Sequence, residues 1–259
     1  MCCAGIVLAS VFLLTSCARQ EMGTLETKES GENQPEKTDL TLMIDETTVS
    51  YYGDMIEELE LEWVEIDSTA PFAGLASLKE LTCSRIPDQT KWDFVVRIPS
   101  LEVLNLNGIK TYEDISALFG MPALRELYLN GVECELDFSK ISPNEHLKIL
   151  GMDGVKLYEN VKISGGGIVY VDYDKVDLND NTGFLTAFPG LTRLSLADNM
   201  LTDISFVSSL PNLEYLDIKD NYVTDITPLE GLGRLSTLNC AGNPVGNLRV
   251  LSSDVTILQ

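Results

Sequence analysis

The stretch that decides the fold runs from Leu191 to Ile204 and reads LTRLSLADNMLTDI. Two further copies follow at steps of 22 residues, as LEYLDIKDNYVTDI and LSTLNCAGNPVGNL. Asn199, Asn221 and Asn243 occupy the same position in the three copies. Tandem self-similarity at this period is typical of a solenoid in which each copy forms one coil. Two alternatives are a chance recurrence of Leu-rich stretches and a set of amphipathic helices. Neither explains why all three copies keep both the same spacing and the same residue types.

The Leu-x-x-Leu-x-Leu part of each copy predicts a short, half-buried strand, because apolar and polar residues alternate at its end. A chain that turns sharply after such a strand leaves inward-facing N–H and C=O groups without partners, and unpaired buried groups are unfavourable. An amide side chain carries donors and acceptors that can pair with both. We therefore predict a structural ladder formed by Asn199, Asn221 and Asn243.

The same register extends upstream at steps of 21 to 23 residues. It predicts about nine coils over residues 56–259, with a final strand at 255–258. The inward residues at the centres of the nine strands are Leu59, Leu81, Leu104, Leu127, Leu150, Val171, Leu194, Leu216 and Leu238. The middle coils have Ile or Val where the last three have Asn, so we expect them to turn differently.

The sequence resembles the leucine-rich repeat family, and specifically its internalin-like bacterial subclass, through the motifs Thr-Asp-Ile-Ser (202–205) and Thr-Asp-Ile-Thr-Pro-Leu (224–229). The resemblance implies an α/β solenoid shaped as an arc or horseshoe. A parallel β-sheet would line the concave side, with short 3-10 or helical turns and loops on the convex side. It also implies a role in contacts at a cell surface, which is an analogy from the fold rather than from a site.

The N-terminal 16 residues are similar to a bacterial lipoprotein signal peptide. Their apolar run, residues 4–14, is too short to span a bilayer. Leu14-Thr15-Ser16-Cys17 matches the lipobox, which implies cleavage before Cys17 and lipidation of its thiol. Ordinary secretion with cleavage nearby is the alternative. Residues 17–39 lack apolar periodicity, which predicts a disordered tether. We expect residues 40–55 to form an N-terminal cap. We expect an extracytoplasmic protein anchored in the bacterial cell envelope.

The formal net charge is −22. Proteins that bind nucleic acid need basic residues to neutralise phosphates, so the charge argues against a nucleic-acid partner. It also argues against direct binding to anionic lipid, leaving the lipid anchor as the only membrane contact. A basic protein partner fits the charge. Solubility alone is the alternative explanation.

No catalytic site is visible in the sequence. His146 is the only histidine, and neither a nucleophile with its base nor a cluster at zinc spacing can be built. The acidic stretch 172–181 lacks the Gly and Glu that an EF-hand requires, which leaves a weak cation site or a solvated acidic face. Cys83, Cys134 and Cys240 take core positions too far apart for a disulfide between the first and the last. We expect no enzyme activity, cofactor or metal.

The register places one set of side chains on the outer face of the sheet. Carboxylates outnumber basic residues there, and aromatic residues project among them, as at interface hot spots. Tyrosine also favours strands for reasons unrelated to binding. The predicted partner-binding residues are Trp63, Tyr128, Tyr170, Asp172, Asp174, Tyr215, Asp217 and Lys219.

Three functions remain open from the sequence. The first is a lipid-anchored module that binds a protein through its concave face. The second is a structural spacer or envelope protein that self-associates at its C-terminal edge, where an uncapped strand invites pairing. The third is a surface protein that binds glycans through its exposed aromatic residues.

Overall fold

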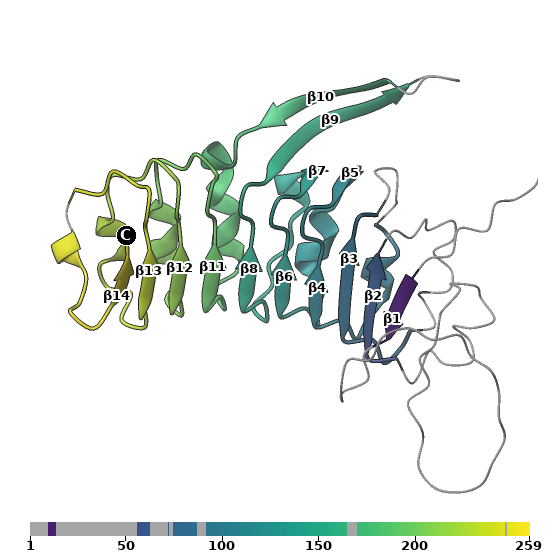
Figure 1. Cartoon of the computed structure of the whole chain (residues 1–259), viewed down its shortest axis with the longest axis horizontal. Coiled ribbons are helices and arrows are strands. Elements are labelled where there is room, and N and C mark those ends of the chain that lie inside the picture. Colours follow the sequence, from purple (N-terminus) through teal and green to yellow (C-terminus); the bar gives the residue numbers. More distant parts are fainter. Residues whose placement is uncertain are drawn as a thin grey trace, which may run out of the picture.

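The structure is a computed structural model that describes residues 10–13, 56–62, 72, 75–86, 92–164, 170–246 and 248–259. In this part of the chain the strands form a ten-stranded main sheet and a four-stranded second sheet (Figure 1). The main sheet contains, in spatial order, β1 (Ser10–Leu13), β2 (Glu58–Glu62), β3 (Glu80–Ser84), β4 (Val103–Asn105), β6 (Glu126–Tyr128), β8 (Ile149–Gly151), β11 (Arg193–Ser195), β12 (Tyr215–Asp217), β13 (Thr237–Asn239) and β14 (Thr256–Leu258).

Strands β2 to β14 of the main sheet are parallel, and the repeat period sets their register. Leu59 pairs with Leu81, Leu81 with Leu104, and the series continues through successive coils to Leu238 and Ile257. The central leucines from β3 to β13 have no exposed surface. The predicted final strand is therefore confirmed as β14. At the other end, β1 pairs antiparallel with β2. Strand β1 belongs to the apolar run of the predicted signal peptide, so the predicted cleavage before Cys17 would remove it from the main sheet. The predicted lipobox, tether and cap lie outside the described residues.

Each coil turns at a residue with a left-handed backbone, four positions after its central leucine. The N–H of this residue donates to a carbonyl of the next coil in every step from Gly108 to Asp220, over 2.6–2.9 Å. The left-handed residue is thus common to the middle and C-terminal coils. The coils differ, as the sequence predicted, in the hydrogen bonds that follow it. The left-handed residues are Arg85, Gly108, Gly131, Gly154, Asp198, Asp220 and Gly242.

In the middle coils, the side chain three positions after the central leucine bonds to the backbone of the next coil. Asn107 Oδ1 accepts the N–H of Asn130 at 2.8 Å, Asn130 Oδ1 that of Asp153 at 2.9 Å, and Asp153 Oδ1 that of Ala197 at 2.8 Å. These coils then continue into the parallel strands β5 (Lys110–Asp114), β7 (Glu133–Glu135) and β9 (Lys156–Ser164). In the turns of these coils the N–H of Ile109 donates to the Leu106 carbonyl and that of Val132 to the Leu129 carbonyl, both at 3.1 Å. Backbone groups that the C-terminal coils pair with an asparagine are here paired with each other.

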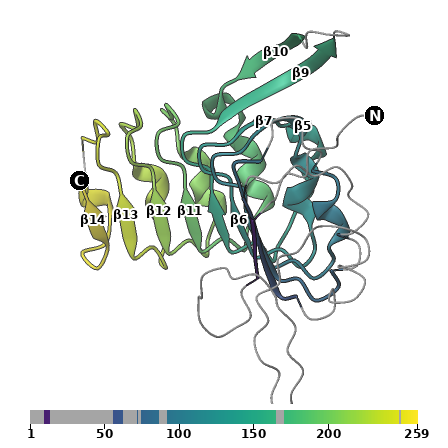
Figure 2. The same ribbon diagram turned by 45° about the vertical axis from the view of Figure 1, so that its right-hand side comes forward.

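The prediction of a coil strand centred on Val171 is wrong. Val171 lies in β10 (Tyr170–Val176), which pairs antiparallel with β9 at the edge of the second sheet. Strand β8 pairs directly with β11, so Leu150 meets Leu194 across 44 residues of sequence. One repeat length of chain leaves the solenoid here as a hairpin, which projects beyond the coils (Figure 1, Figure 2). The backbone of β8 is satisfied by β11, so the solenoid loses no pairing when this segment turns outward.

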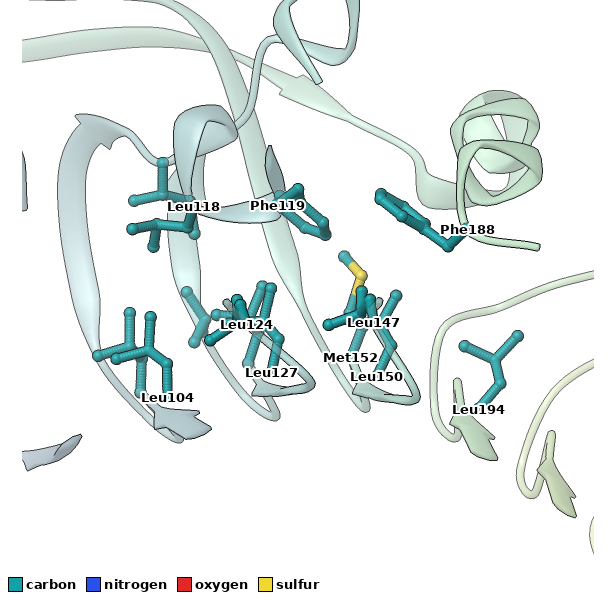
Figure 3. Packing of buried hydrophobic residues seen from close by; sticks show 14 of the residues in the cluster. Leu104, Leu118, Phe119, Leu124, Leu127, Leu147, Leu150, Met152, Phe188 and Leu194 are labelled. Atoms are coloured by element: carbon teal, nitrogen blue, oxygen red, sulfur yellow. The ribbon is translucent and has the colours of Figure 1, made fainter. Parts of the chain in front are cut away.

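Short 3-10 helices cover the side of the coils opposite the main sheet, as the resemblance implied (Figure 1). Phe119 and Phe188, in and after two of these helices, stack with ring centroids 5.7 Å apart over the central leucines (Figure 3). Cys83, Cys134 and Cys240 are buried and free. The helices are η3 (Val95–Arg97), η4 (Ser116–Gly120), η5 (Phe138–Lys140), η6 (Leu178–Ala187), η7 (Ser205–Ser209), η8 (Thr227–Leu229) and η9 (Leu248–Val250).

Candidate binding surfaces

The three repeat asparagines bond to inward-facing backbone groups of neighbouring coils. Asn199 Nδ2 donates to the carbonyl of Met152 at 2.7 Å, so it links coils on either side of the hairpin. Asn221 Oδ1 accepts two N–H groups of the preceding coil, at 2.8 and 3.0 Å. Asn243 Oδ1 accepts the N–H of Val223 at 2.9 Å. Asn199 and Asn221 are buried and Asn243 is partly buried, and the hydrogen bonds of all three join neighbouring coils.

The outward-facing residues of β2 to β14 form a surface that we call the sheet face. Of the predicted partner-binding residues, Tyr128, Tyr215 and Asp217 lie on it, and Lys219 follows β12. Asp172 and Asp174 are exposed, but they lie on β10 of the hairpin, as does the backbone of Tyr170. The sequence placed these three on the sheet face because Val171 fitted the repeat period. Trp63 and the predicted lipidation site Cys17 lie outside the described residues.

Tyr215 is held in place by three neighbours at the C-terminal end of the sheet face. Its hydroxyl donates to Asp217 Oδ2 at 3.1 Å, and the Arg193 guanidinium lies 4.6 Å from its ring centroid. Asn239 Nδ2 donates to the same Asp217 oxygen at 2.8 Å. Burial, followed by the Asp217 carboxylate, raises the pKa of the Tyr215 phenol. These contacts favour the neutral phenol and present an ordered, partly buried ring.

Tyr128 is fixed in the same way on β6. Its hydroxyl donates to Glu126 Oε2 at 2.7 Å, and burial together with this hydrogen bond raises the pKa of the phenol to about 12. Towards the N-terminal end the face is acidic. Burial, then the carboxylates of Glu58 and Glu126, raises the pKa of Glu80. Among the described residues, no basic side chain forms an ion pair with Glu58 or Glu80.

Small residues follow Tyr128 along its own row of the sheet face. In the row that contains Tyr128, the next two strands contribute Gly151 and Ser195. Gly151 has no room for a side chain, because a Cβ there would lie 2.8 Å from Asn130 Oδ1. The Ser195 hydroxyl donates a hydrogen bond to Asp153 Oδ1 at 2.6 Å. Tyr128 and Tyr215 lie on neighbouring rows three strands apart, a lateral separation of roughly 14 Å. Ile149 and Arg193 stand between them in the row of Tyr215.

Glu126 and Arg193 belong to this constellation, although the sequence prediction did not include them among the partner-binding residues. Each precedes the central leucine of its strand, as Tyr215 does, so the repeat register already placed them on the same row. The missing signal was the contact itself, since no sequence pattern shows that Arg193 would lie over Tyr215.

The described part of the chain offers no arrangement for other chemistry. Within it, no group of three or more His, Cys, Asp or Glu side chains is placed to hold a metal ion. No helix there is both long and apolar enough to cross a membrane. His146 is exposed in a turn, and its backbone N–H donates to Asn144 Oδ1 at 2.9 Å.

Comparisons with known proteins agree with this architecture. Residues 189–231 match the family model described as Leucine Rich repeats (2 copies). The chain is similar to an internalin (inlF) from Listeria monocytogenes, with 23% identity and a TM-score of 0.55, over 81% of this chain and 62% of that one. It is also similar to Listeria monocytogenes InlP, with 17% identity and a TM-score of 0.50, over 77% of this chain and 52% of that one.

A third similar structure is TLR13 in its complex with ssRNA13, with 20% identity and a TM-score of 0.53. That match covers 74% of this chain and 26% of TLR13. No curated protein sequence matches the chain. Leucine-rich repeat proteins in general mediate protein–protein interaction and are typically non-enzymatic scaffolds. The fold of this protein is a leucine-rich repeat solenoid.

Proposed function

We propose that this protein is a lipid-anchored, extracytoplasmic module that binds a basic protein through its sheet face. The observation that carries the proposal is the pair of immobilised tyrosines, Tyr128 and Tyr215, each bonded to a carboxylate. Side chains that are already ordered lose little conformational entropy on binding, and tyrosine supplies a large contact area. The surrounding carboxylates favour a cationic partner and speed its approach. Asp217 and Lys219 complete the proposed contact surface.

Protein is favoured over nucleic acid as the ligand. TLR13 holds ssRNA in a solenoid of the same general fold. A phosphate backbone, however, needs several basic side chains, and the N-terminal half of this sheet face presents Glu58, Glu60, Glu80 and Glu126. The net charge of −22 points the same way.

The binding proposal is tested with immobilised protein spanning residues 38–259, incubated with cell-surface extracts and then with the purified captured partner. Truncating an interface anchor costs about 2 kcal/mol or more in binding free energy, so Tyr128→Ala with Tyr215→Ala should weaken binding at least tenfold. The matched control, Tyr112→Ala with Tyr222→Ala, removes two tyrosines outside the sheet face. Equal affinity of both double variants would rule this face out.

The lipid anchor is tested separately, because it rests on the motif that ends at Cys17. We expect the wild-type protein in the membrane fraction with incorporated labelled fatty acid, and Cys17→Ala in the soluble fraction without label. A membrane-bound Cys17→Ala protein would contradict the anchor and leave the binding proposal standing.

Self-association is the second candidate, and the position of β14 favours it. Within the described chain β14 pairs only with β13, and Leu258 is 46% exposed. An open strand edge can template pairing with another chain. Light scattering of the purified protein distinguishes the two functions, because a stable oligomer at micromolar concentration supports assembly and a monomer supports the binding module.

A further inference from the structure

The inner end of the β9–β10 hairpin packs on the solenoid through Leu157 and pairs with β7, but the outer part is not needed by the main sheet. Main-sheet pairing passes directly from β8 to β11, so the coils stack without it. Two-stranded hairpins are marginal on their own, and Ile163 near the far end of this one is 56% exposed. The strand β10 forms one edge of the second sheet, and β9 is its only strand partner in the described chain.

We propose that β10 is a docking edge for an extended segment of another protein in which basic and apolar residues alternate. A sheet edge offers a row of unpaired N–H and C=O groups, to which such a segment can add as one more strand. This surface lies on the projecting hairpin and is separate from the sheet face.

The backbone of β10 is regular, as a template strand must be. The register with β9 shifts between Asp172, which pairs with Lys162, and Asp174, which pairs with Glu159. The extra residue therefore belongs to β9, where Asn160 has a φ of 55°. A β-bulge bends the strand that contains it. Here it leaves the alternation along β10 intact.

The two faces of β10 differ in chemistry and define the partner. Val171 lies opposite Ile163, and the Tyr173 ring packs on Tyr158 with centroids 4.1 Å apart, so this face is apolar up to Lys175, which is exposed at its C-terminal end. On the other face Asp172 and Asp174 are exposed. Asp172 lies opposite Lys162 of β9, and Asp174 Oδ2 accepts a hydrogen bond from Asn160 Nδ2 at 3.0 Å, so the strand-free side of both carboxylates is what an added strand would meet. An added strand would set every second side chain against each face. Apolar residues match the first face, and lysine or arginine opposite the two aspartates gives favourable cross-strand pairs.

A second copy of this chain fits the same edge poorly. Antiparallel pairing of two β10 strands centred on Tyr173 would set Asp172 of each copy against Asp174 of the other. Like charges directly opposite each other are destabilising. Charges on an edge strand also serve in other proteins to prevent pairing altogether. That role is one outcome of the test below.

The test measures binding of fluorescent seven-residue peptides to the full chain by anisotropy at physiological salt. One peptide alternates lysine and valine, a second alternates glutamate and valine, and a third alternates lysine and proline. The third has the charge of the first but cannot form a strand, because proline lacks an N–H and fixes φ. We expect the lysine–valine peptide to bind at least tenfold more tightly than either other peptide.

A charge reversal identifies the edge. In Asp172→Lys with Asp174→Lys, the preference should switch to the glutamate–valine peptide by about tenfold or more, since both cross-strand pairs change sign. The control Glu214→Lys with Glu230→Lys makes the same change in net charge at exposed sites on the solenoid and should keep the original preference. Hydrogen exchange of β10 amides should slow when the lysine–valine peptide binds.

Three results would overturn the proposal. Equal losses in the two charge variants, or equal binding of the proline peptide, would reduce the effect to general attraction by an acidic protein. No binding of the lysine–valine peptide would show that Asp172 and Asp174 only protect the edge.

Discussion

Replacing Asn221 with alanine tests how the C-terminal coils are held together. The Asn221 side chain is 2% exposed. Its Oδ1 accepts the N–H groups of Asn199 at 3.0 Å and Leu201 at 2.8 Å, and its Nδ2 donates to the carbonyl of Leu196 at 2.9 Å. Within the described chain these three backbone groups have no other hydrogen-bond partner. The substitution leaves all three unpaired in the interior.

The magnitude follows from the number of groups that lose their partner. A buried polar group left unsatisfied costs about 1–3 kcal/mol, so the three groups together lower the free energy of unfolding by at least about 3 kcal/mol. Asn243→Ala is the matched comparison. Asn243 is only partly buried, its Oδ1 serves the single N–H of Val223, and its Nδ2 shares the Ile218 carbonyl with Asn221. We expect Asn243→Ala to cost about 1 kcal/mol.

The assay is urea unfolding followed by circular dichroism and by tryptophan fluorescence, with linear extrapolation to water. Solenoids can unfold in stages, so the two signals must coincide before a single free energy is quoted. Hydrogen exchange adds a local measurement at the amides of Asn199 and Leu201. An Asn221→Ala protein within about 0.5 kcal/mol of wild type, or one more stable than Asn243→Ala, would refute the ladder as a source of stability.

Three further predictions concern other parts of the fold. Glu80→Gln should raise the melting temperature at pH 7, because the raised pKa of Glu80 means that its ionised form is unfavourable in the folded state. The wild-type protein loses this stability as the pH rises through the pKa of Glu80 in the folded state. The melting temperatures of wild type and Glu80→Gln should therefore converge below about pH 4, where Glu80 is protonated in both the folded and the unfolded state. Gly190→Ala should cost about 1–3 kcal/mol in unfolding free energy, because its Cβ would clash with the Glu145 carbonyl, whereas Gly183→Ala meets nothing within 4 Å and should change stability by under about 1 kcal/mol. Replacing residues 159–175 with a short glycine linker should leave the melting temperature of the solenoid nearly unchanged, and a large loss would contradict the separation of hairpin and coils.

The repeat period was sufficient to predict most of the main sheet. Each coil contacts only its neighbours, so a local pattern repeated along the chain fixes the global stacking. Leu81, Leu104 and Leu127 meet in consecutive strands as the spacing predicted. The spacing failed at Val171 because a period measures only the length of a segment. A hairpin of one repeat length keeps the register of the coils that follow it. The glycines at 165–167 between two strand-like runs were a hairpin signal of the kind that sequence offers.

The second sheet was missed for a different reason. Val132, Cys134 and Leu136 alternate in burial, as strand residues do, and Ile109 begins a similar alternation. A single alternating run of this length also fits a loop that packs on a core. Only its parallel neighbours, supplied by adjacent coils, make it a strand.

The sequence by itself determined the solenoid, most of the strand register, the interior place of Asn199, Asn221 and the cysteines, and the acidic character of the sheet face. These follow from periodicity and charge, which are local properties. Only the tertiary structure decided that Asp172 and Asp174 stand on a projecting hairpin while Tyr128 and Tyr215 remain on the sheet. The physical reason is that the repeat spacing fits β10 and β11 equally as the next strand after β8, whereas the structure pairs β8 with β11. The choice between them depends on packing across 44 residues of chain.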